Sequence, residues 1–148
     1  MALRSTELMI GDWIGLDSAI PHFEDKEVRI EQEITPCQVV KFDDYQVVVK
    51  RPDKQFQVVL YDAISPIQLT KEILERNDFL NIGQQVIQYK NGLYWVWVEE
   101  DTMRLGIDAN NDSWDGEATT PMLRLYINYV HQLQHALSLC NINKEIKI

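Results

Sequence analysis

The sequence has few cysteines, no long apolar run and no Pro/Gly/Ser-rich linker, and each absence excludes a class of protein. Its two cysteines, Cys37 and Cys140, lie far apart without metal-ligand spacing, which is typical of small buried side chains in a cytosolic protein. No run approaches the ~20 apolar residues that span a bilayer. Residues 1–13 lack the apolar core of a secretory signal. We therefore expect a cytoplasmic protein that does not enter a membrane.

The patterns of common active sites are also missing. The chain has no GxSxG nucleophile motif, no phosphate-binding GxxxxGK[ST] or GxGxxG loop, and no HExxH zinc motif. Its three histidines suggest no general-base group. The sequence thus assigns no catalytic residue and no cofactor. A small-molecule enzyme remains an alternative, because 23 acidic residues always permit some carboxylate pair.

What is present is ordinary globular composition with an uneven negative charge. Of 148 residues, 45% are hydrophobic and 25% charged, which predicts a folded domain. The formal charge of −9 comes mainly from residues 1–33, with eight acids and three bases, and residues 99–117, with seven acids and one base. An acidic field disfavours nucleic acid and anionic lipid, whose phosphates need cations. A basic protein partner is expected, unless the acids serve only solubility.

The first part of the chain has the alternation of β-strands. Residues 9–15 predict a short strand broken at Gly11 and Gly15. From Val28 to Ile34, apolar and charged residues alternate as in a half-buried strand. Short β-branched runs separated by turn residues follow at 37–42, 45–50 and 55–61. This pattern predicts an antiparallel meander or a small barrel.

The remainder predicts a mixed α and β region. After Ser65-Pro66, Thr70 is placed to cap a short helix that ends at Asn77-Asp78. Asn91-Gly92 predicts a two-residue hairpin turn in which Tyr89 opposes Tyr94. One face of that hairpin is then core-like, with Ile87, Tyr89, Tyr94, Val96 and Val98, and the other carries Trp95 and Trp97.

Further strands at 103–108 and 122–127 would extend this sheet through an acidic loop at 109–120. Asn128 is placed to cap an amphipathic helix over 129–140, with His131 and His135 on its solvent side and Asn141 at its exit. Residues 145–148 could form a closing strand. The expected fold is α+β: a β-rich N-terminal half, a short helix, a hairpin sheet and a C-terminal helix packed on it. Residues 1–148 form one domain, or two tightly fused subdomains, 1–64 and 65–148.

Two groups of residues are candidates for binding. Trp95 and Trp97 point the same way, either under the C-terminal helix as core or exposed as an aromatic anchor for a partner. Trp114, with Asp115 and Glu117 beside it, would suit a basic partner if the indole is exposed.

Two patterns resemble metal sites only in part. Asp108, Asn110 and Asp112 alternate like the first ligands of a calcium loop, but Ser113 and Thr119 stand where the glycine and the glutamate belong. An acidic turn is the alternative. His131 and His135 have ligand spacing on a helix but no third ligand nearby, so ordinary surface histidines are expected.

Three segments together resemble a family of small uncharacterised proteins found in Bacteroidota and in their phages and phage-like elements. They are LMIGDWI at 8–14, SPIQLTKEILERNDF at 65–79 and YVHQLQHAL at 129–137, the last followed by a closing KEIKI. The family usually has a glycine after the last helix, where this chain has Asn141-Ile142-Asn143. Asparagine tolerates the left-handed conformation, so the geometry can survive. The resemblance implies a bacterial or phage accessory protein and no established activity.

The function predicted from these observations is a small acidic accessory protein that binds another protein. A sharper version is an inhibitor that presents carboxylates to a basic host protein in place of nucleic acid. The alternatives are a virion or assembly structural component, which would oligomerise, and a small-molecule enzyme, which would need a cleft with paired titratable groups.

Overall fold

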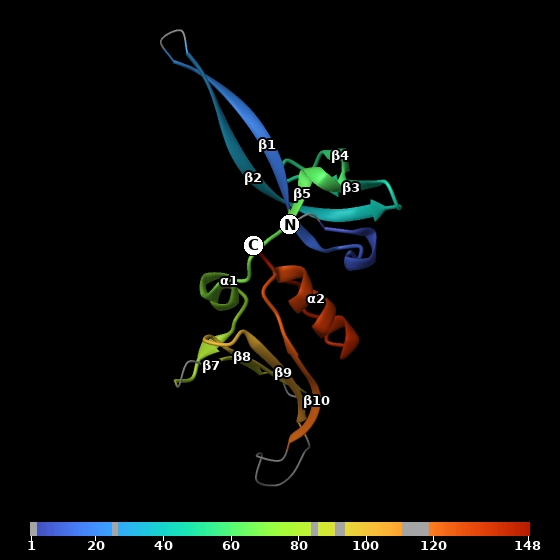
Figure 1. Ribbon diagram of the computed structural model, residues 1–148. Coiled ribbons are helices and arrows are strands. Elements are labelled where there is room, and N and C mark those ends of the chain that lie inside the picture. The colour runs from blue at the N-terminus through green and yellow to red at the C-terminus, as the bar shows by residue number, and fades with distance from the viewer. Residues whose placement is uncertain (1–2, 25–26, 84–85, 91–93, 111–118) are drawn as a thin grey trace. The chain divides into compact units, whose positions relative to one another are not determined.

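The computed structural model describes residues 3–24, 27–83, 86–90, 94–110 and 119–148 (Figure 1). The chain divides into two compact units, Met1–Ile67 (unit 1) and Gln68–Ile148 (unit 2), a division that falls near the expected subdomain boundary. Each unit contains one five-stranded sheet, all of whose strand pairs are antiparallel. The two α-helices of the described residues are both in unit 2. The fold is therefore α+β with a β-rich majority, as expected.

Unit 1 consists of a sheet and two short 3₁₀ turns. The sheet has the strand order β4-β3-β2-β1-β5. Its strands are β1 (Trp13–Glu24), β2 (Glu27–Phe42), β3 (Gln46–Lys50), β4 (Phe56–Leu60) and β5 (Ile64–Pro66), and the 3₁₀ turns are η1 (Ser5–Glu7) and η2 (Tyr61–Ala63). Its core consists of side chains that are at most 8% exposed: Leu3, Leu8, Ile14, Leu16, Cys37, Val39, Val47, Val49, Val59 and Ile64. Strands β2, β3 and β4 follow one another as the predicted meander.

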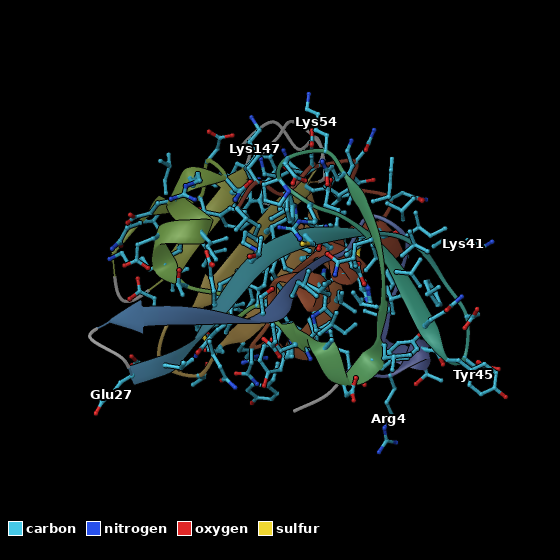
Figure 2. The ribbon with its side chains drawn as sticks, turned by 90° about the horizontal axis from the view of Figure 1, so that it is seen from above. Arg4, Glu27, Lys41, Tyr45, Lys54 and Lys147 are labelled. Atoms are coloured by element: carbon cyan, nitrogen blue, oxygen red, sulfur yellow. The ribbon has the colours of Figure 1, made fainter. Side chains whose placement is uncertain are left out.

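The β2–β3 turn shows how local polar groups set this meander. The Asp43 carboxylate accepts hydrogen bonds from the backbone N–H groups of Tyr45 and Gln46, at 2.8 and 2.9 Å. These two bonds hold the pKa of Asp43 below its ordinary value, because they favour the charged form. Figure 2 shows Tyr45 projecting outward at this turn.

The first strand differs from its prediction. β1 begins at Trp13 and runs through Gly15, so the expected strand over 9–15 with breaks at both glycines is wrong. Gly11 instead takes a φ of 93° in the turn before the strand, and its N–H donates to the carbonyl of Val39 at 2.7 Å. Gly15 has ordinary strand geometry and lies beneath Ile34, where a Cβ would come within 2.6 Å of a side-chain methyl.

Unit 2 packs helices and a sheet around one core. The strand order is β10-β9-β8-β7-β6. The elements, in chain order, are α1 (Lys71–Arg76), β6 (Leu80–Asn81), β7 (Val86–Lys90), β8 (Tyr94–Glu99), β9 (Arg104–Asn110), β10 (Thr119–Tyr126) and α2 (Val130–Leu139). The antiparallel extension of the hairpin sheet by two further strands is confirmed.

The β7–β8 register is shifted by two residues from its prediction. Tyr89 pairs with Val96, not with Tyr94, and Lys90 pairs with Trp95. The Asn91-Gly92 dipeptide itself lies outside the described residues. Because side chains alternate with a period of two, a shift of two leaves every residue on its predicted face. Accordingly the core-like face is the buried one, with Ile87, Val96 and Val98 fully buried.

The helix ends follow local chemistry, with one correction. The Thr70 hydroxyl caps α1 as predicted, accepting from the N–H of Ile73 at 3.3 Å. At α2, however, the capping residue is Tyr129, so the predicted Asn128 cap is wrong. The Gln132 side chain reaches back instead, and its Oε1 accepts from the N–H groups of Asn128 and Tyr129. Asn141 leaves α2 with a φ of 56°, in the left-handed conformation expected of it.

The C-terminal residues are extended, but they form no strand, so the predicted closing strand is wrong. A buried asparagine side chain takes the place of a neighbouring strand. Asn77 Nδ2 donates to the carbonyls of Ile73 and Lys147, both at 2.7 Å, and Asn77 Oδ1 accepts from the N–H of Lys147 at 2.7 Å. We call these hydrogen bonds between Asn77 and Lys147 the clasp. Ile146, next to the clasp in the chain, is only 2% exposed. Within the described ranges, no helix has both the length and the apolar character needed to cross a bilayer.

Candidate interaction surfaces

The β1–β2 hairpin of unit 1 extends beyond the strands that flank it, β5 and β3 (Figure 1). β1 and β2 pair continuously from Trp13↔Gln38 to Glu24↔Glu27. β5 pairs with β1 only at 14–16, and β3 pairs with β2 only at 38–42. Residues 17–24 and 27–34, which we call the arm, therefore pair only with each other among the described strands. At about 3.3 Å per residue, the arm is about 26 Å long.

The arm has an apolar side and an acidic side. Val28 and Ile34 are six residues apart, so they share a face of β2, and they are 59% and 63% exposed. The exposed Glu27 and Glu33 occupy the alternate positions. Residues 17–34 hold six acids and two bases, a formal charge of −4. The expectation that Val28 and Ile34 are half-buried is wrong, because unit 1 has a single sheet and none of its described residues forms a second layer over them.

Both strands of the arm have a free edge. In a two-stranded ribbon, each strand pairs on one side only, so backbone N–H and C=O groups remain open along the other side. Isolated two-stranded ribbons are marginally stable in water. The arm is thus the part of unit 1 whose order gains most from a partner.

A second surface lies on the sheet of unit 2, around Trp97. The indole Nε1 donates to Asp108 Oδ2 at 3.1 Å, and Arg124 Nη2 donates to Asp108 Oδ1 at 2.5 Å. The Arg124 guanidinium carbon is 4.9 Å from the Trp97 ring centroid. Beneath the indole is Gly106, where a Cβ would come far closer than 3.0 Å to the ring. The ring is therefore held in one orientation by a cation, a carboxylate and a glycine.

Trp95 lies on the same face as Trp97. Its ring is covered by the Lys90 ammonium, 3.9 Å from the centroid. Both indoles are half-buried, whereas Val96 and Val98, between and beside them in the strand, are fully buried on the opposite face. Cation–π contacts of this kind contribute about 0.5–1 kcal/mol at exposed positions. The face is aromatic and cationic, and it presents fixed rings of the kind that anchor protein partners.

The predicted acidic loop at 109–120 lies mostly outside the described residues, and its described ends, 109–110 and 119–120, belong to β9 and β10. Trp114, Asp115, Glu117 and Asp112 lie outside the described residues. Asp108 is 7% exposed and already binds Trp97 and Arg124. No group of three or more His, Cys, Asp or Glu side chains that could hold a metal ion occurs within the ranges that the structure describes.

The two helix histidines differ in burial. His131 is only 4% exposed, so its predicted solvent-side position is wrong. It lies in the first turn of α2, where the Tyr129 ring stacks on it with centroids 5.9 Å apart. The His131 and His135 rings meet edge to face at 5.6 Å. Tyr129 is the N-cap of α2 and has extended backbone geometry, so its ring does not take the position on the helical wheel that a helix over 129–140 predicts, and it stacks on His131.

Unit 2 also contains a small apolar hollow beside α1. Its volume is about 200 Å³, and Leu69, Leu74, Ile87, Val98 and Met103 provide its apolar lining. Its titratable groups are Lys71 and Glu100, whose Nζ and Oε1 atoms are 3.7 Å apart. Ligand pockets typically measure about 300–1,000 Å³. The hollow therefore offers an ion pair at an apolar wall and no pair of carboxylates.

Neither cysteine is placed for chemistry. Cys37 and Cys140 are free thiols in the cores of unit 1 and unit 2, 0% and 7% exposed. Burial raises the pKa of both thiols, because it disfavours the thiolate. Their expected role as small buried side chains is confirmed.

No protein-family model, no curated protein and no solved structure matches the chain. The interaction surfaces thus rest on geometry alone. The tryptophans of the hairpin could be found from sequence alternation, but the arm could not. Alternating residues from 27 to 34 predict a strand equally well whether a second layer covers it or not.

Proposed function

We propose that this chain is a small protein-interaction module that binds a basic protein partner through its arm. The observation that carries the proposal is the ribbon at 17–24 and 27–34, which pairs with no other described strand and has a formal charge of −4. The arm coincides with most of the acidic N-terminal block. The partner it suits has cations for the carboxylates and an apolar strip for Val28 and Ile34.

The arm offers two kinds of contact at once. Its carboxylates attract a basic surface over several ångströms and speed association. Its open strand edges and exposed aliphatic side chains then give short-range hydrogen bonds and apolar burial. An arm with charge alone would bind weakly and without orientation, and these further contacts supply a register.

The resemblance to small proteins of Bacteroidota and their phages supports a role as an accessory protein of bacteria or mobile elements, which we propose acts in the cytoplasm. In the sharper form of the proposal, the partner is a nucleic-acid-binding host protein, and the arm carboxylates occupy the site of phosphates. No catalytic step is included, because the hollow of unit 2 is small and holds one ion pair.

The experiment is affinity purification of the tagged full chain from the cells that encode it, with a matched charge control. Glu27→Lys with Glu33→Lys reverses two exposed arm charges. Glu75→Lys with Glu145→Lys reverses two exposed charges of unit 2, so the net charge changes equally. We expect the affinity of the arm variant for the captured partner to fall at least about tenfold, because charge pairs across interfaces contribute about 1.4 kcal/mol or more. The control should retain it.

Salt dependence gives a second measurement. Screening shortens the range of the field from about 10 Å at 0.1 M salt to about 3 Å at 1 M. Binding should therefore weaken steeply as salt is raised. A complex that persists unchanged to ~0.5 M salt, or that the arm variant leaves intact, would rule out the proposed surface.

A further inference from the structure

Strand β4 forms an unprotected edge of the unit 1 sheet. It pairs with β3 on one side and is the last strand in the sheet order. Phe56, Val58 and Leu60 alternate along it and are 64%, 59% and 60% exposed. The run from Gln55 to Tyr61 contains no charged residue and no proline. Such a strand is an open template for another chain.

The other three strands that end the two sheet orders, β5, β6 and β10, are each protected. β5 is three residues long and ends in Pro66, and β6 is two residues long. β10 contains Pro121 and Arg124 and has an irregular register between Pro121 and Leu123. Short length, proline, charge and bulges are the usual devices that prevent edge-to-edge pairing. β4 has none of them.

The strand is complementary to itself in antiparallel pairing. With Val58 opposite Val58 of a second copy, Phe56 faces Leu60 in both directions, and the three exposed side chains of each copy share one face. A register shifted by one residue would place the exposed apolar face of one β4 beside the buried face of the other. That register is therefore excluded. A shift of two would bring Leu60 opposite Lys54.

Charges just beyond the strand favour the same register. Lys54 and Asp62 each lie two residues outside β4, at opposite ends, and both are exposed. Figure 2 shows Lys54 projecting from the turn before β4. Pairing centred on Val58 brings the turn that carries Lys54 of each copy to the same end of the joined strands as the η2 turn that carries Asp62 of the other. Each end of the joined strands then has an opposite-charge pair.

We propose that β4 pairs with β4 of a second copy of this chain, forming a two-fold dimer with one continuous sheet. Val48, which pairs with Val58 within the sheet, continues the apolar face of β4, and this face runs on across the joined sheets of the dimer. Three side chains and a short ladder bury less than the ~1,200 Å² of a standard interface, so a dissociation constant of about 10–100 μM is expected. The dimer does not involve the arm and does not depend on its function.

The test is sedimentation equilibrium of the full chain from about 1 to 500 μM, a range that brackets the expected constant. A monomer–dimer equilibrium is expected. Val58→Lys places like charges opposite each other at the two-fold axis and should raise the dissociation constant at least about tenfold. Tyr45→Lys adds the same charge at an 82% exposed residue outside β4 and should leave the constant unchanged.

A charge exchange tests the register and does not alter the apolar strand. Lys54→Asp and Asp62→Lys should each weaken the dimer about threefold to tenfold, because each removes both symmetric pairs. The double variant should restore it. Lys54 has a φ of 65°, which aspartate tolerates. A chain that stays monomeric to ~500 μM, a dimer unaffected by Val58→Lys, or a double variant as weak as the singles would overturn the proposal.

Discussion

The two units contain sheets of the same size and use them differently. Unit 2 covers one face of its sheet, caps its helices and protects its edges, and even its open face has cations stacked on tryptophans. Unit 1 has no α-helix among its described residues. Within the described ranges it exposes eight large hydrophobic side chains, Met9, Ile10, Val28, Ile34, Tyr45, Phe56, Val58 and Leu60, and unit 2 exposes five, Leu80, Ile82, Met122, Tyr126 and Leu139. We infer from this difference that unit 1, more than unit 2, provides the surfaces that contact partners.

The largest expected effect compares the two strand glycines that lie beneath a side chain. Gly106→Ala pushes a methyl group into the Trp97 ring, which Asp108 and Arg124 hold in place. Gly15→Ala brings a methyl group within 2.6 Å of Cγ2 of the exposed Ile34 side chain and within 3.2 Å of Ser65 Oγ, and both of these side chains are less firmly held than the Trp97 ring. We expect the free energy of unfolding to fall by about 3 kcal/mol in the first variant and about 1 kcal/mol in the second.

Denaturant titration measures both losses, and the cysteines report where they occur. Each unit contains one buried thiol, Cys37 in unit 1 and Cys140 in unit 2. Gly106→Ala should speed alkylation of Cys140 more than that of Cys37. Equal losses in the two variants would show that Trp97 moves as freely as Ile34 and that unit 2 is less rigid than its contacts indicate.

A smaller effect is expected at the clasp of unit 2. Asn77→Ala removes three hydrogen bonds at 2.7 Å and leaves the partly buried N–H and C=O groups of Lys147 without their side-chain partner. The cost should be about 2–3 kcal/mol, the penalty for unsatisfied buried groups. Hydrogen exchange of the Lys147 amide should rise in parallel. Asn143→Ala, at an exposed position of the same segment, is the control and should change stability by less than about 0.5 kcal/mol.

The smallest effect concerns acid stability of unit 1. The folded pKa of Asp43 is lowered from 3.8 by its hydrogen bonds to Tyr45 and Gln46. Its ionised form therefore stabilises the fold above pH 3.8, and this contribution is lost as the pH falls through the lower, folded value. Asp43→Asn keeps an acceptor without the charge, so thermal unfolding of the variant should depend less on pH in this range. Asp44→Asn should behave like the parent chain.

How far the sequence predicts the structure depends on whether a signal is local. The sequence predicts the Thr70 cap of α1 correctly, because a helix cap depends only on residues a few positions apart. The β7–β8 pairing was placed on the right faces but in the wrong register, since alternation repeats every two residues and cannot detect a shift of two. Of the arm, the sequence predicts only the strand over 28–34; it predicts neither the strand over 17–24 nor the exposure of the hairpin. Exposure of Val28 depends on whether another layer covers it, and that is a long-range property.

The clasp between Asn77 and Lys147 has a consequence for the order of events during synthesis. Unit 1 can complete its sheet once residue 67 is free, but unit 2 cannot close its clasp until residue 147 has followed. At 5–20 residues per second, translation of those last 80 or so residues takes roughly 4–16 s. Throughout that interval, neighbouring nascent chains on one messenger would expose finished β4 edges to each other. We therefore expect pairing between copies to begin on the polysome, before unit 2 has formed its clasp.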